Sequence, residues 1–384
     1  MAYLVERLQG FGTTIFAEMS ALAVRTNSVN LGQGFPDTDG PAEMLRAASD
    51  ALFSGRHNQY PPGPGIPELR AAIARHQKRF YDQDFDPDTE VFVTTGATEA
   101  IAAAIIALAG PGDEVVVFEP LYDSYAATIA MAGAIRKVVT LRTPDYHIDP
   151  DELRAAITDR TRLILLNSPH NPTGKVFSRA ELELVAELAR EHDLLVVTDE
   201  VYEHLVFDGE HIPLSTLPGM RERTVTISSA GKTFSVTGWK IGWICAPEEL
   251  VSAVRTTKQF LTYVSGGPFQ PAVALALDLG DEYYAGLLDG LRRQRDVLCD
   301  GLEKVGFEVL RPAGTYFATV DVRSLGYDDG MAFCRELPGK VGVVAIPSTV
   351  FYDTEAGRTL VRFAFCKRPE VLEEAVRRLQ TLHP

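Results

Sequence analysis

The chain alternates short, β-branched apolar runs with longer amphipathic stretches from about residue 41 to about residue 275. Such alternation is typical of strands and helices that build a largely parallel sheet. Helical periodicity over 97–108 and 180–192 predicts two of the helices. Strands are predicted at 90–95, at 114–118, and in the runs RLILLN, LLVVTD and TVTISS, which end at Asn167, Asp199 and Ser229.

The pattern changes after Pro271. A long section rich in Ala, Leu and Arg predicts helix through Lys304, and GFEVL, TYFATVDV and a closing helix from Pro369 follow it. We therefore expect a second, α+β lobe, which agrees with a length of 384 residues that exceeds what one compact core usually holds.

The segment 27–34, with Pro and Gly around it, predicts an arm or hinge that is not a packed element and that rejoins the second lobe. The expected division is an N-terminal segment over 1–40 that joins the small domain, a large domain over 41–275, and a small domain over 276–384.

Composition indicates a globular protein, with 46% hydrophobic and 23% charged residues. The net charge of −15 argues against nucleic acid or anionic membrane as a partner, because such binding needs Lys and Arg to neutralise phosphates. Glu6 and Arg7 interrupt the N-terminus where a signal peptide needs an apolar run, and no stretch is long enough to span a membrane. We expect a cytoplasmic protein.

The four cysteines, at 245, 299, 334 and 366, lie far apart, so their spacing predicts neither a zinc site nor a redox CxxC motif. We therefore expect no metal and no disulfide framework.

Polar residues follow the predicted strands at Asn171, Asp199, Ser229 and Lys232. In open α/β sheets, ligands bind at the carboxyl ends of the strands. Lys232 has small neighbours in SSAGKTFSVTGWKIGW, and its amine could form a Schiff base if burial near a cation such as Lys240 lowers its pKa. The alternative is that both lysines are surface cations.

Asp199 follows a strand that we expect to be buried, so its carboxylate needs a cationic partner such as a protonated pyridine nitrogen. A helix cap is the alternative for Asp199. Tyr202 lies three residues later and could reach the same ligand, although such a tyrosine is more often a core residue. Asn171, in NSPHNPTGK, could aim its amide at a ligand oxygen, or it could simply belong to a turn.

Gly96, Ala97 and Thr98 form a glycine turn before a predicted helix, which is a natural phosphate-binding position. Capping of the helix by Thr98 is the alternative.

Two further side chains are candidates. Tyr60, in NQYPPGPG, would be exposed on a lone chain and indicates a partner surface. Arg362, in LVRFAFCK, alternates with apolar neighbours like a strand residue, and its guanidinium could bind a carboxylate through two hydrogen bonds. A surface salt bridge is the alternative for Arg362.

In this order the motifs resemble those of the fold-type-I aminotransferases that depend on pyridoxal 5'-phosphate (PLP), nearly from end to end. The motifs are NLGQGFPD, NQYPPGPG, TTGATEAI, EPLYDSY, NSPHNPTGK, TDEVYEHLVF, SSAGKTFSVTGWKIGW and VRFAFCK. They are most similar to the branch of kynurenine, glutamine and methionine aminotransferases. FAEMSALA, GATEAIAAA, DEVYEHLVFD, PFQPAVALALD and KVGVVAIP look most like the actinobacterial N-succinyldiaminopimelate aminotransferases.

The resemblance implies a homodimer, with a large domain whose mostly parallel seven-stranded sheet lies between helices and a smaller α+β domain. It implies that Lys232 is the Schiff-base lysine and the acid/base for the proton shift, that Asp199 pairs with the pyridine nitrogen, and that Tyr202 and Asn171 bind the phenolic oxygen. Tyr122 of EPLYDSY would stack on the ring, where relatives often have Phe.

By the same resemblance, the phosphate ligands would come from the turn at Gly96, from Ala97, Thr98, Ser229 and Lys240, and from Tyr60 across the dimer interface. Arg362 would bind the substrate α-carboxylate near Gly34 and Asn171. Several other aminotransferase branches have Arg at position 240, so Lys240 favours this branch without fixing a substrate.

The implied reaction moves an amino group between an L-amino acid and a 2-oxo acid, with glutamate and 2-oxoglutarate as the expected pair and N-succinyl-LL-diaminopimelate, of lysine biosynthesis, as a candidate substrate. A broad-specificity kynurenine, glutamine or methionine aminotransferase and a cysteine-S-conjugate β-lyase are the alternatives, since a β-lyase shares the lysine, the aspartate and the fold. A PLP-binding regulator would need a DNA-binding segment, and no basic or helix-turn-helix segment precedes residue 40. A nicotinamide enzyme would need GxGxxG after a predicted strand, which the chain does not have.

Overall fold

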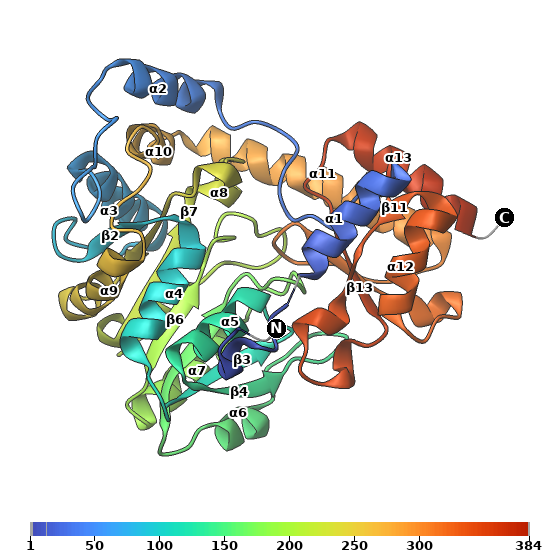
Figure 1. Cartoon of the computed structure of the whole chain (residues 1–384), viewed down its shortest axis with the longest axis horizontal. Helices are drawn as coiled ribbons and strands as arrows, with labels where there is room; N and C mark the ends of the chain where they lie inside the picture. The colour runs from blue at the N-terminus through green and yellow to red at the C-terminus, as the bar shows by residue number, and fades with distance from the viewer. Residues whose placement is uncertain (1–2, 13, 383–384) are drawn as a thin grey trace.

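The computed structural model describes residues 3–12 and 14–382, and it contains a larger and a smaller lobe (Figure 1). The larger lobe is built on a seven-stranded sheet in the order β2-β8-β7-β6-β5-β3-β4. Its strands are β2 (Val91–Thr94), β3 (Glu114–Glu119), β4 (Ile135–Thr140), β5 (Thr161–Asn167), β6 (Leu195–Asp199), β7 (Thr224–Ser229) and β8 (Gly242–Cys245).

This sheet is parallel except for β8, which runs antiparallel to both of its neighbours, β2 and β7. The strands predicted from the sequence are confirmed as β2, β3, β5, β6 and β7, and they are buried along almost their whole length because helices cover both faces of the sheet. Two strands were not predicted. β4 is an edge strand with polar residues, and β8 is a four-residue strand hidden within the motif around Lys232.

Helices cover the sheet on both faces. α4 (Gly96–Leu108), α5 (Asp123–Ala132) and α9 (Glu248–Leu261) share one apolar core with it. The other face packs against α6 (Pro150–Ala156) and α7 (Arg179–Glu191), and β2 and β8 pack there against α2 (Ala42–Phe53), α3 (Pro67–Tyr81) and α10 (Gln270–Leu277). The two helices predicted from periodicity are thus confirmed as α4 and α7, and a capping box between Ser178 and Glu181 fixes the start of α7.

The smaller lobe has a four-stranded antiparallel sheet in the order β12-β13-β10-β9. Its elements are β9 (Glu308–Leu310), β10 (Phe317–Asp321), β12 (Ile346–Pro347), β13 (Leu360–Ala364), α11 (Asp281–Val305), α12 (Gly330–Val341) and α13 (Pro369–Leu379). The helical section expected to continue through Lys304 is two helices, α10 and α11, which are separated at residues 278–280.

The segment from residue 15 to residue 30 lies against this lobe (Figure 1). α1 (Ile15–Thr26) packs there, and β1 (Val29–Asn30) pairs in parallel with β11 (Val343–Val344). Leu31 is fully buried, so the expectation that 27–34 is not a packed element is wrong. The partner strand of β1 is β11, which lies more than three hundred residues away in the chain, and local sequence cannot reveal such a pairing.

The helices within the described residues include none that combines the length and the apolar character needed to cross a membrane. All four cysteines are buried and free.

Candidate active site

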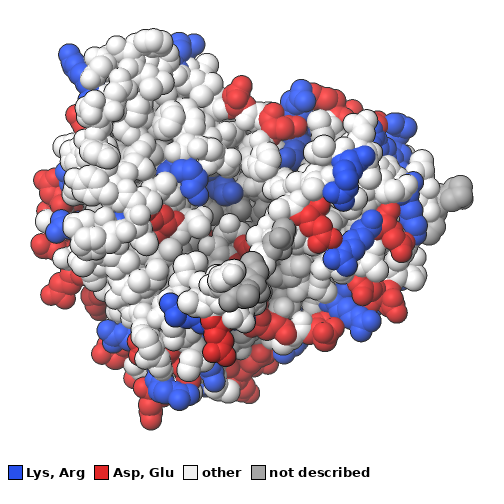
Figure 2. Space-filling model, viewed as in Figure 1, with Lys and Arg blue, Asp and Glu red and all other residues white. Residues whose placement is uncertain are grey.

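The carboxyl ends of β5, β6 and β7 open into a cavity of about 410 Å³ that lies between the two lobes. Figure 2 shows a recess between the lobes. All the predicted site residues except Tyr60 line this cavity: Gly34, Gly96, Ala97, Thr98, Tyr122, Asn171, Asp199, Tyr202, Ser229, Lys232, Lys240 and Arg362. The topology therefore brings together side chains that the sequence spreads over more than three hundred residues.

Hydrogen bonds between neighbouring strands hold the floor of the cavity. Asn167 and Asp199 end adjacent strands and are partners in register. The Asn167 side chain donates to the Asp199 carbonyl oxygen at 2.8 Å and accepts from the backbone N–H of Asn171 at 2.8 Å. The turn with Asn171 is thus fixed to the ends of both strands. Asn167 was not predicted to be a site residue.

The Asp199 carboxylate is 5% exposed, and the Tyr125 hydroxyl donates to its Oδ2 at 2.6 Å. Burial raises the pKa of Asp199, while the hydrogen bond from Tyr125 acts in the opposite direction. The expected alternative, a helix cap, does not hold because residues 201–204 form turns, not a helix. Asp199 has no Lys or Arg ion-pair partner within 4 Å among the described residues, so a cationic ligand would suit it.

Lys232 lies on α8 (Ala230–Thr233), a single turn that follows β7. Its Nζ is 5.7 Å from the ring centroids of both Tyr202 and Tyr316. Burial lowers the pKa of Lys232, and the positive charges of Arg362 and Lys240 act in the same direction. Lys232 is therefore not a surface cation, and its amine faces the cavity.

The first turn of α4 provides an anion-binding end of the cavity. Its N-cap is Thr95, whose side chain makes no capping bond and instead contacts Thr262 and Ser265, so the alternative of a cap by Thr98 does not hold. The N–H groups at the start of α4 therefore face the cavity without a side-chain acceptor.

Two glycines allow Lys240 and the strand that follows it to lie close to the first turn of α4. Gly96 has a φ of +74°, and a Cβ placed on it would lie 3.4 Å from Nζ of Lys240. A Cβ on Gly242 would lie 2.7 Å from the backbone nitrogen of Ala97. The Lys240 ammonium group thus lies beside the first turn of α4. The positive charge of Lys240 and the positive end of the helix dipole both favour an anion bound at this point.

Arg362, on β13, is 1% exposed and lies over the Phe317 ring with its Cζ 4.0 Å from the centroid. It donates to Asn171 Oδ1 and to the Gly32 carbonyl oxygen, both at 3.0 Å, and its Nε has no partner. Burial lowers the pKa of Arg362 to about 10. The expected alternative, a surface salt bridge, does not hold, because the side chain is buried and pairs with an amide and a carbonyl.

Gly34 lies beside this guanidinium. A Cβ on Gly34 would come within 2.5 Å of the Phe317 ring, and its carbonyl oxygen accepts a 2.6 Å hydrogen bond from Tyr316. Tyr122 is the N-cap of α5, and its ring packs edge-on against Tyr125. Burial raises the pKa of Tyr122 to about 12, so its hydroxyl is neutral.

Sequence reasoning missed several lining residues: Thr14, Phe16, Gln33, Phe35, Ile101, Asp123, Tyr125, Asn167, Val201, Gly231, Thr237, Ile241 and Phe317. Tyr125 could have been found, because it lies one helical turn after Tyr122 within EPLYDSY. Phe16 and Gln33 come from the N-terminal segment, and only the packing of that segment brings them to the cavity.

Residues 26–379 match the family model for aminotransferases of class I and II. The chain therefore belongs to this family, and it is an aminotransferase with the fold-type-I architecture. The predicted family, fold class and enzyme activity are confirmed.

The chain is 56% identical over 391 residues to "Probable N-succinyldiaminopimelate aminotransferase DapC" of Mycobacterium tuberculosis, with 98% of each chain covered. It is 41% identical over 377 residues to the methionine aminotransferase of Escherichia coli, which covers 98% of this chain and 97% of the relative. The solved structure of N-succinyldiaminopimelate aminotransferase from Mycobacterium tuberculosis superimposes with a TM-score of 0.96 at 57% identity, over 99% of this chain and 100% of that one.

Enzymes of this family use PLP, and the donor set of the cavity fits that cofactor. A phosphate needs free N–H groups and a cation, which the start of α4 and Lys240 provide. A pyridine nitrogen needs a carboxylate, and no Lys or Arg of residues 3–12 and 14–382 pairs with Asp199. An aldehyde needs an amine of lowered pKa, which Lys232 has.

Proposed function

We propose that this chain is a PLP-dependent transaminase in which Lys232 carries the cofactor. The enzyme would interconvert two pairs of an amino acid and its 2-oxo acid. One pair would be glutamate and 2-oxoglutarate, and the other would be N-succinyl-LL-diaminopimelate and its 2-oxo form. The 56% identity to the mycobacterial relative over 98% of both chains supports this substrate. Lysine biosynthesis is the pathway in which such a reaction would take part.

The observation that carries the proposal is the convergence of three groups on one cavity: the Lys232 amine, the buried Asp199 carboxylate and the buried Arg362 guanidinium. When bound, PLP supplies an electron sink that stabilises negative charge at the substrate Cα. Asp199 would keep the ring nitrogen protonated, while Asn171 and Tyr202 would bind the phenolic oxygen. Tyr122 would pack on the face of the ring.

Lys232 would also move the proton. Its lowered pKa favours a neutral amine, which can accept the proton from the substrate Cα. The same amine would then return the proton to the carbon on the cofactor side of the transferred nitrogen. The rings of Tyr202 and Tyr316 lie at equal distances from Nζ and limit where the amine can go. One side chain would thus serve as the attachment point and as the acid/base.

Arg362 would bind the substrate α-carboxylate. A buried guanidinium without a carboxylate partner has unused hydrogen-bonding capacity, and here its Nε is the unpaired donor. Asn171 holds the guanidinium from one side, and Gly34, where a Cβ would clash with the Phe317 ring, lines the same cavity. The phosphate would lie at Gly96, Ala97, Thr98, Ser229 and Lys240.

Tyr60 would complete the phosphate site of a second subunit. It is 81% exposed and packs edge-on against Tyr263 at 5.5 Å, and it does not line the cavity of its own chain. Phe53 and Phe260 are also exposed, at 89% and 81%, and the face over α2 and α10 carries few charged side chains (Figure 2). An apolar surface of this kind suits a homodimer interface. We propose the same domain division as above, at residues 40 and 275.

The experiment that tests the substrate mixes the PLP-bound enzyme, without an acceptor, with glutamate, N-succinyldiaminopimelate, methionine, glutamine and kynurenine in turn. Loss of the visible absorption band of the lysine-bound cofactor measures each half-reaction. Fast loss with glutamate and the succinylated diamine alone supports the proposal. Preference for the other three amino acids would make the enzyme a broad-specificity aminotransferase, which the 41% identity to the methionine enzyme favours as the second candidate.

A further inference from the structure

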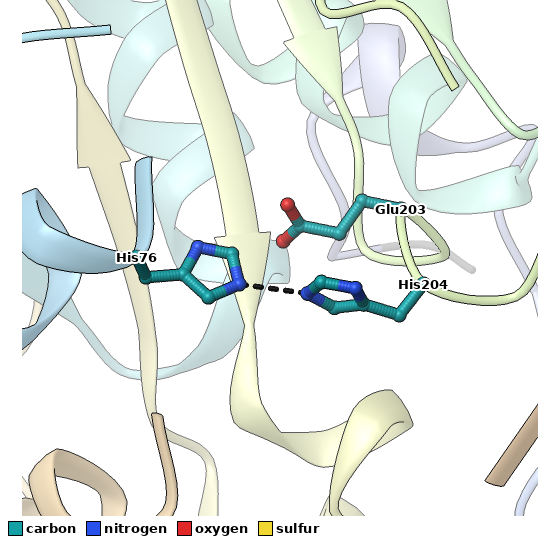
Figure 3. Close-up of side chains that lie close together, drawn as sticks. All are labelled: His76, Glu203 and His204. Atoms are coloured by element: carbon teal, nitrogen blue, oxygen red, sulfur yellow. Dashed lines mark hydrogen bonds between the residues drawn. The ribbon is translucent and has the colours of Figure 1, made fainter. Parts of the chain in front are cut away.

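Next to Asp199 at the end of β6 and to the turns that carry Tyr202, a second group of polar side chains lies outside the cavity. His76 comes from α3, and Glu203 and His204 follow Tyr202 in the turns after β6 (Figure 3). One ligand atom from each residue lies within 4.8 Å of the other two. His76 and Glu203 are buried, and His204 is partly exposed.

The two imidazoles point at each other. Nε2 of His76 and Nε2 of His204 are 2.7 Å apart, and the Glu203 carboxylate lies beside the pair (Figure 3). Only one proton can lie between the two nitrogens, so two imidazole nitrogens and a carboxylate converge with at most one donor hydrogen among them. Convergent acceptors of this kind are the arrangement that a cation requires.

The environment of the Glu203 carboxylate also favours a bound cation. Its carboxylate is 6% exposed and accepts from the Tyr81 hydroxyl at 2.7 Å and from the Ser228 hydroxyl at 2.5 Å. Both partners are neutral, and among the described residues no Lys or Arg nitrogen lies within ion-pair distance of Glu203. A buried carboxylate without a cationic partner is costly, so a positive charge at this point would stabilise the fold.

The neighbouring charged side chains do not supply this positive charge. The neighbouring Glu200 is also buried and is bonded to His211 at 2.8 Å. Arg79, on the same helix as His76, pairs with Asp281 and the Leu279 carbonyl oxygen. The cluster and the neighbouring pair of Glu200 and His211 thus hold two buried carboxylates and three histidines, and the Arg79 guanidinium is already paired.

We propose that His76, Glu203 and His204 form a binding site for a divalent transition-metal ion of the zinc class, which ties α3 to the turns that bear Tyr202 and follow Asp199 at the end of β6. Two imidazole nitrogens and one carboxylate oxygen are ligands that Zn²⁺ prefers, with a fourth position open to water. Tetrahedral bonds of about 2.0–2.1 Å put two ligand atoms roughly 3.3 Å apart. The two imidazole nitrogens, now 2.7 Å apart, must therefore separate by roughly 0.6 Å, and the Glu203 oxygen, which lies within 4.8 Å of them, must come to the same distance. The partial exposure of His204 gives the ion a path of entry.

The site is separate from the reaction. None of the three side chains lines the active-site cavity, and the ion would act on the loop from behind. The proposal therefore makes a claim about composition and stability that does not depend on which amino acid the enzyme uses.

The test uses the full-length, PLP-bound enzyme without an affinity tag. The enzyme is treated with a chelator, dialysed against Zn²⁺ and then against buffer, and its metal content is measured by mass spectrometry. We expect about one zinc ion per chain in the natural protein. His76→Gln and His204→Gln should each bind zinc at least roughly tenfold more weakly, since each removes one ligand. Gln can still donate a hydrogen bond across the pair, which favours folding of both variants.

The matched control is His147→Gln, because His147 is a surface histidine whose side chain is 61% exposed and pairs with Asp145. This variant should bind as much zinc as the natural protein. Co²⁺ in place of Zn²⁺ should give the ligand-field absorption of a four-coordinate site in the natural protein and the control, but not in His204→Gln. Added Zn²⁺ should also raise the midpoint of thermal unfolding of the natural protein and the control, and not of the two cluster variants.

Clearly substoichiometric zinc in the natural protein after dialysis would overturn the proposal. Equal zinc content or an equal thermal shift in His204→Gln and in the natural protein would overturn it too, because the ion would then be bound elsewhere. In the first case the cluster would be a hydrogen-bonded histidine pair beside the Glu203 carboxylate.

Discussion

The hydroxyl of Tyr125 donates a 2.6 Å hydrogen bond to Oδ2 of Asp199, and both side chains are buried. This contact joins α5 to the end of β6 and is the main side-chain interaction of the carboxylate in the cavity floor. Because the bond favours the ionised form, it opposes the effect of burial on the pKa of Asp199.

Tyr125→Phe should therefore raise the pKa of Asp199 further. A hydrogen bond to a charged group is worth about 1.5–3 kcal/mol, which corresponds to roughly one to two pH units. Since Asp199 must be ionised to pair with a protonated ring nitrogen, the acidic limb of the kcat profile should move to higher pH by that amount. A pH series of kcat measures the shift.

The control is Tyr146→Phe, because Tyr146 is a buried tyrosine whose hydroxyl has no hydrogen-bond partner among the described residues. Its profile should match that of the natural enzyme. An unchanged acidic limb in Tyr125→Phe would mean that this hydrogen bond does not set the ionisation of Asp199.

Lys232→Ala should abolish the visible band of the covalently attached cofactor and lower turnover by at least about a hundredfold, since the acid/base is lost with it. The fold should persist, because Lys232 lies on a single helical turn and its Nζ makes no ion pair among the described residues. Absorption spectra, circular dichroism and steady-state rates measure the three quantities. Undiminished transamination would refute the role of Lys232.

Arg362→Lys should weaken binding of amino acids through the loss of the guanidinium geometry, although it keeps the charge. We expect kcat/KM for an amino acid to fall roughly tenfold to a thousandfold, and kcat/KM for the corresponding amine without an α-carboxylate to change little. The ratio of the two values in each enzyme is the readout. Equal losses for both substrates would show that Arg362 does not contact the carboxylate.

Tyr60→Phe should loosen PLP in the dimer, because the proposed hydrogen bond from the partner subunit to the phosphate is lost. The dissociation constant of PLP should rise roughly fivefold to fifteenfold, which corresponds to about 1–1.5 kcal/mol for one hydrogen bond. Equilibrium dialysis measures it, and the control is Tyr263→Phe, which keeps the ring against which Tyr60 packs, removes only its hydroxyl and should leave the dissociation constant unchanged. An active, obligate monomer would contradict the shared site.

Glu119→Ala should destabilise the contact between the lobes. Glu119 is fully buried at the end of β3 and accepts hydrogen bonds from Thr140, the Asp353 backbone N–H and Thr354, so its removal leaves three donors unsatisfied. We expect the free energy of unfolding to fall by about 2–4 kcal/mol, as measured by urea denaturation.

Glu183→Ala is the control for Glu119, because Glu183 is exposed and its contact with Arg179 spans 4.0 Å. Its unfolding free energy should change by less than about 0.5 kcal/mol. A similarly small change in Glu119→Ala would show that its buried hydrogen bonds contribute little to the stability of the lobe contact.

The sequence by itself determined the parallel sheet and where its chemistry lies. Apolar runs that are buried on both faces are continuous, so β3, β5, β6 and β7 could be recognised locally. In a parallel sheet all such strands end at one edge, and the polar residues that follow them must therefore meet there. This is why Asp199, Ser229 and Lys232 could be placed in one site before any packing was known.

Only the tertiary structure decided which side chains support that site. The bond from Tyr125 to Asp199, the pairing of β1 with β11 and the position of Arg362 against Phe317 join segments that are far apart in the chain. β8 was missed because a four-residue strand that begins with glycine has no clear periodicity. His76 and His204 likewise meet only because α3 packs behind the loop after β6, and contacts of this kind depend on how elements pack, which local patterns of polarity do not specify.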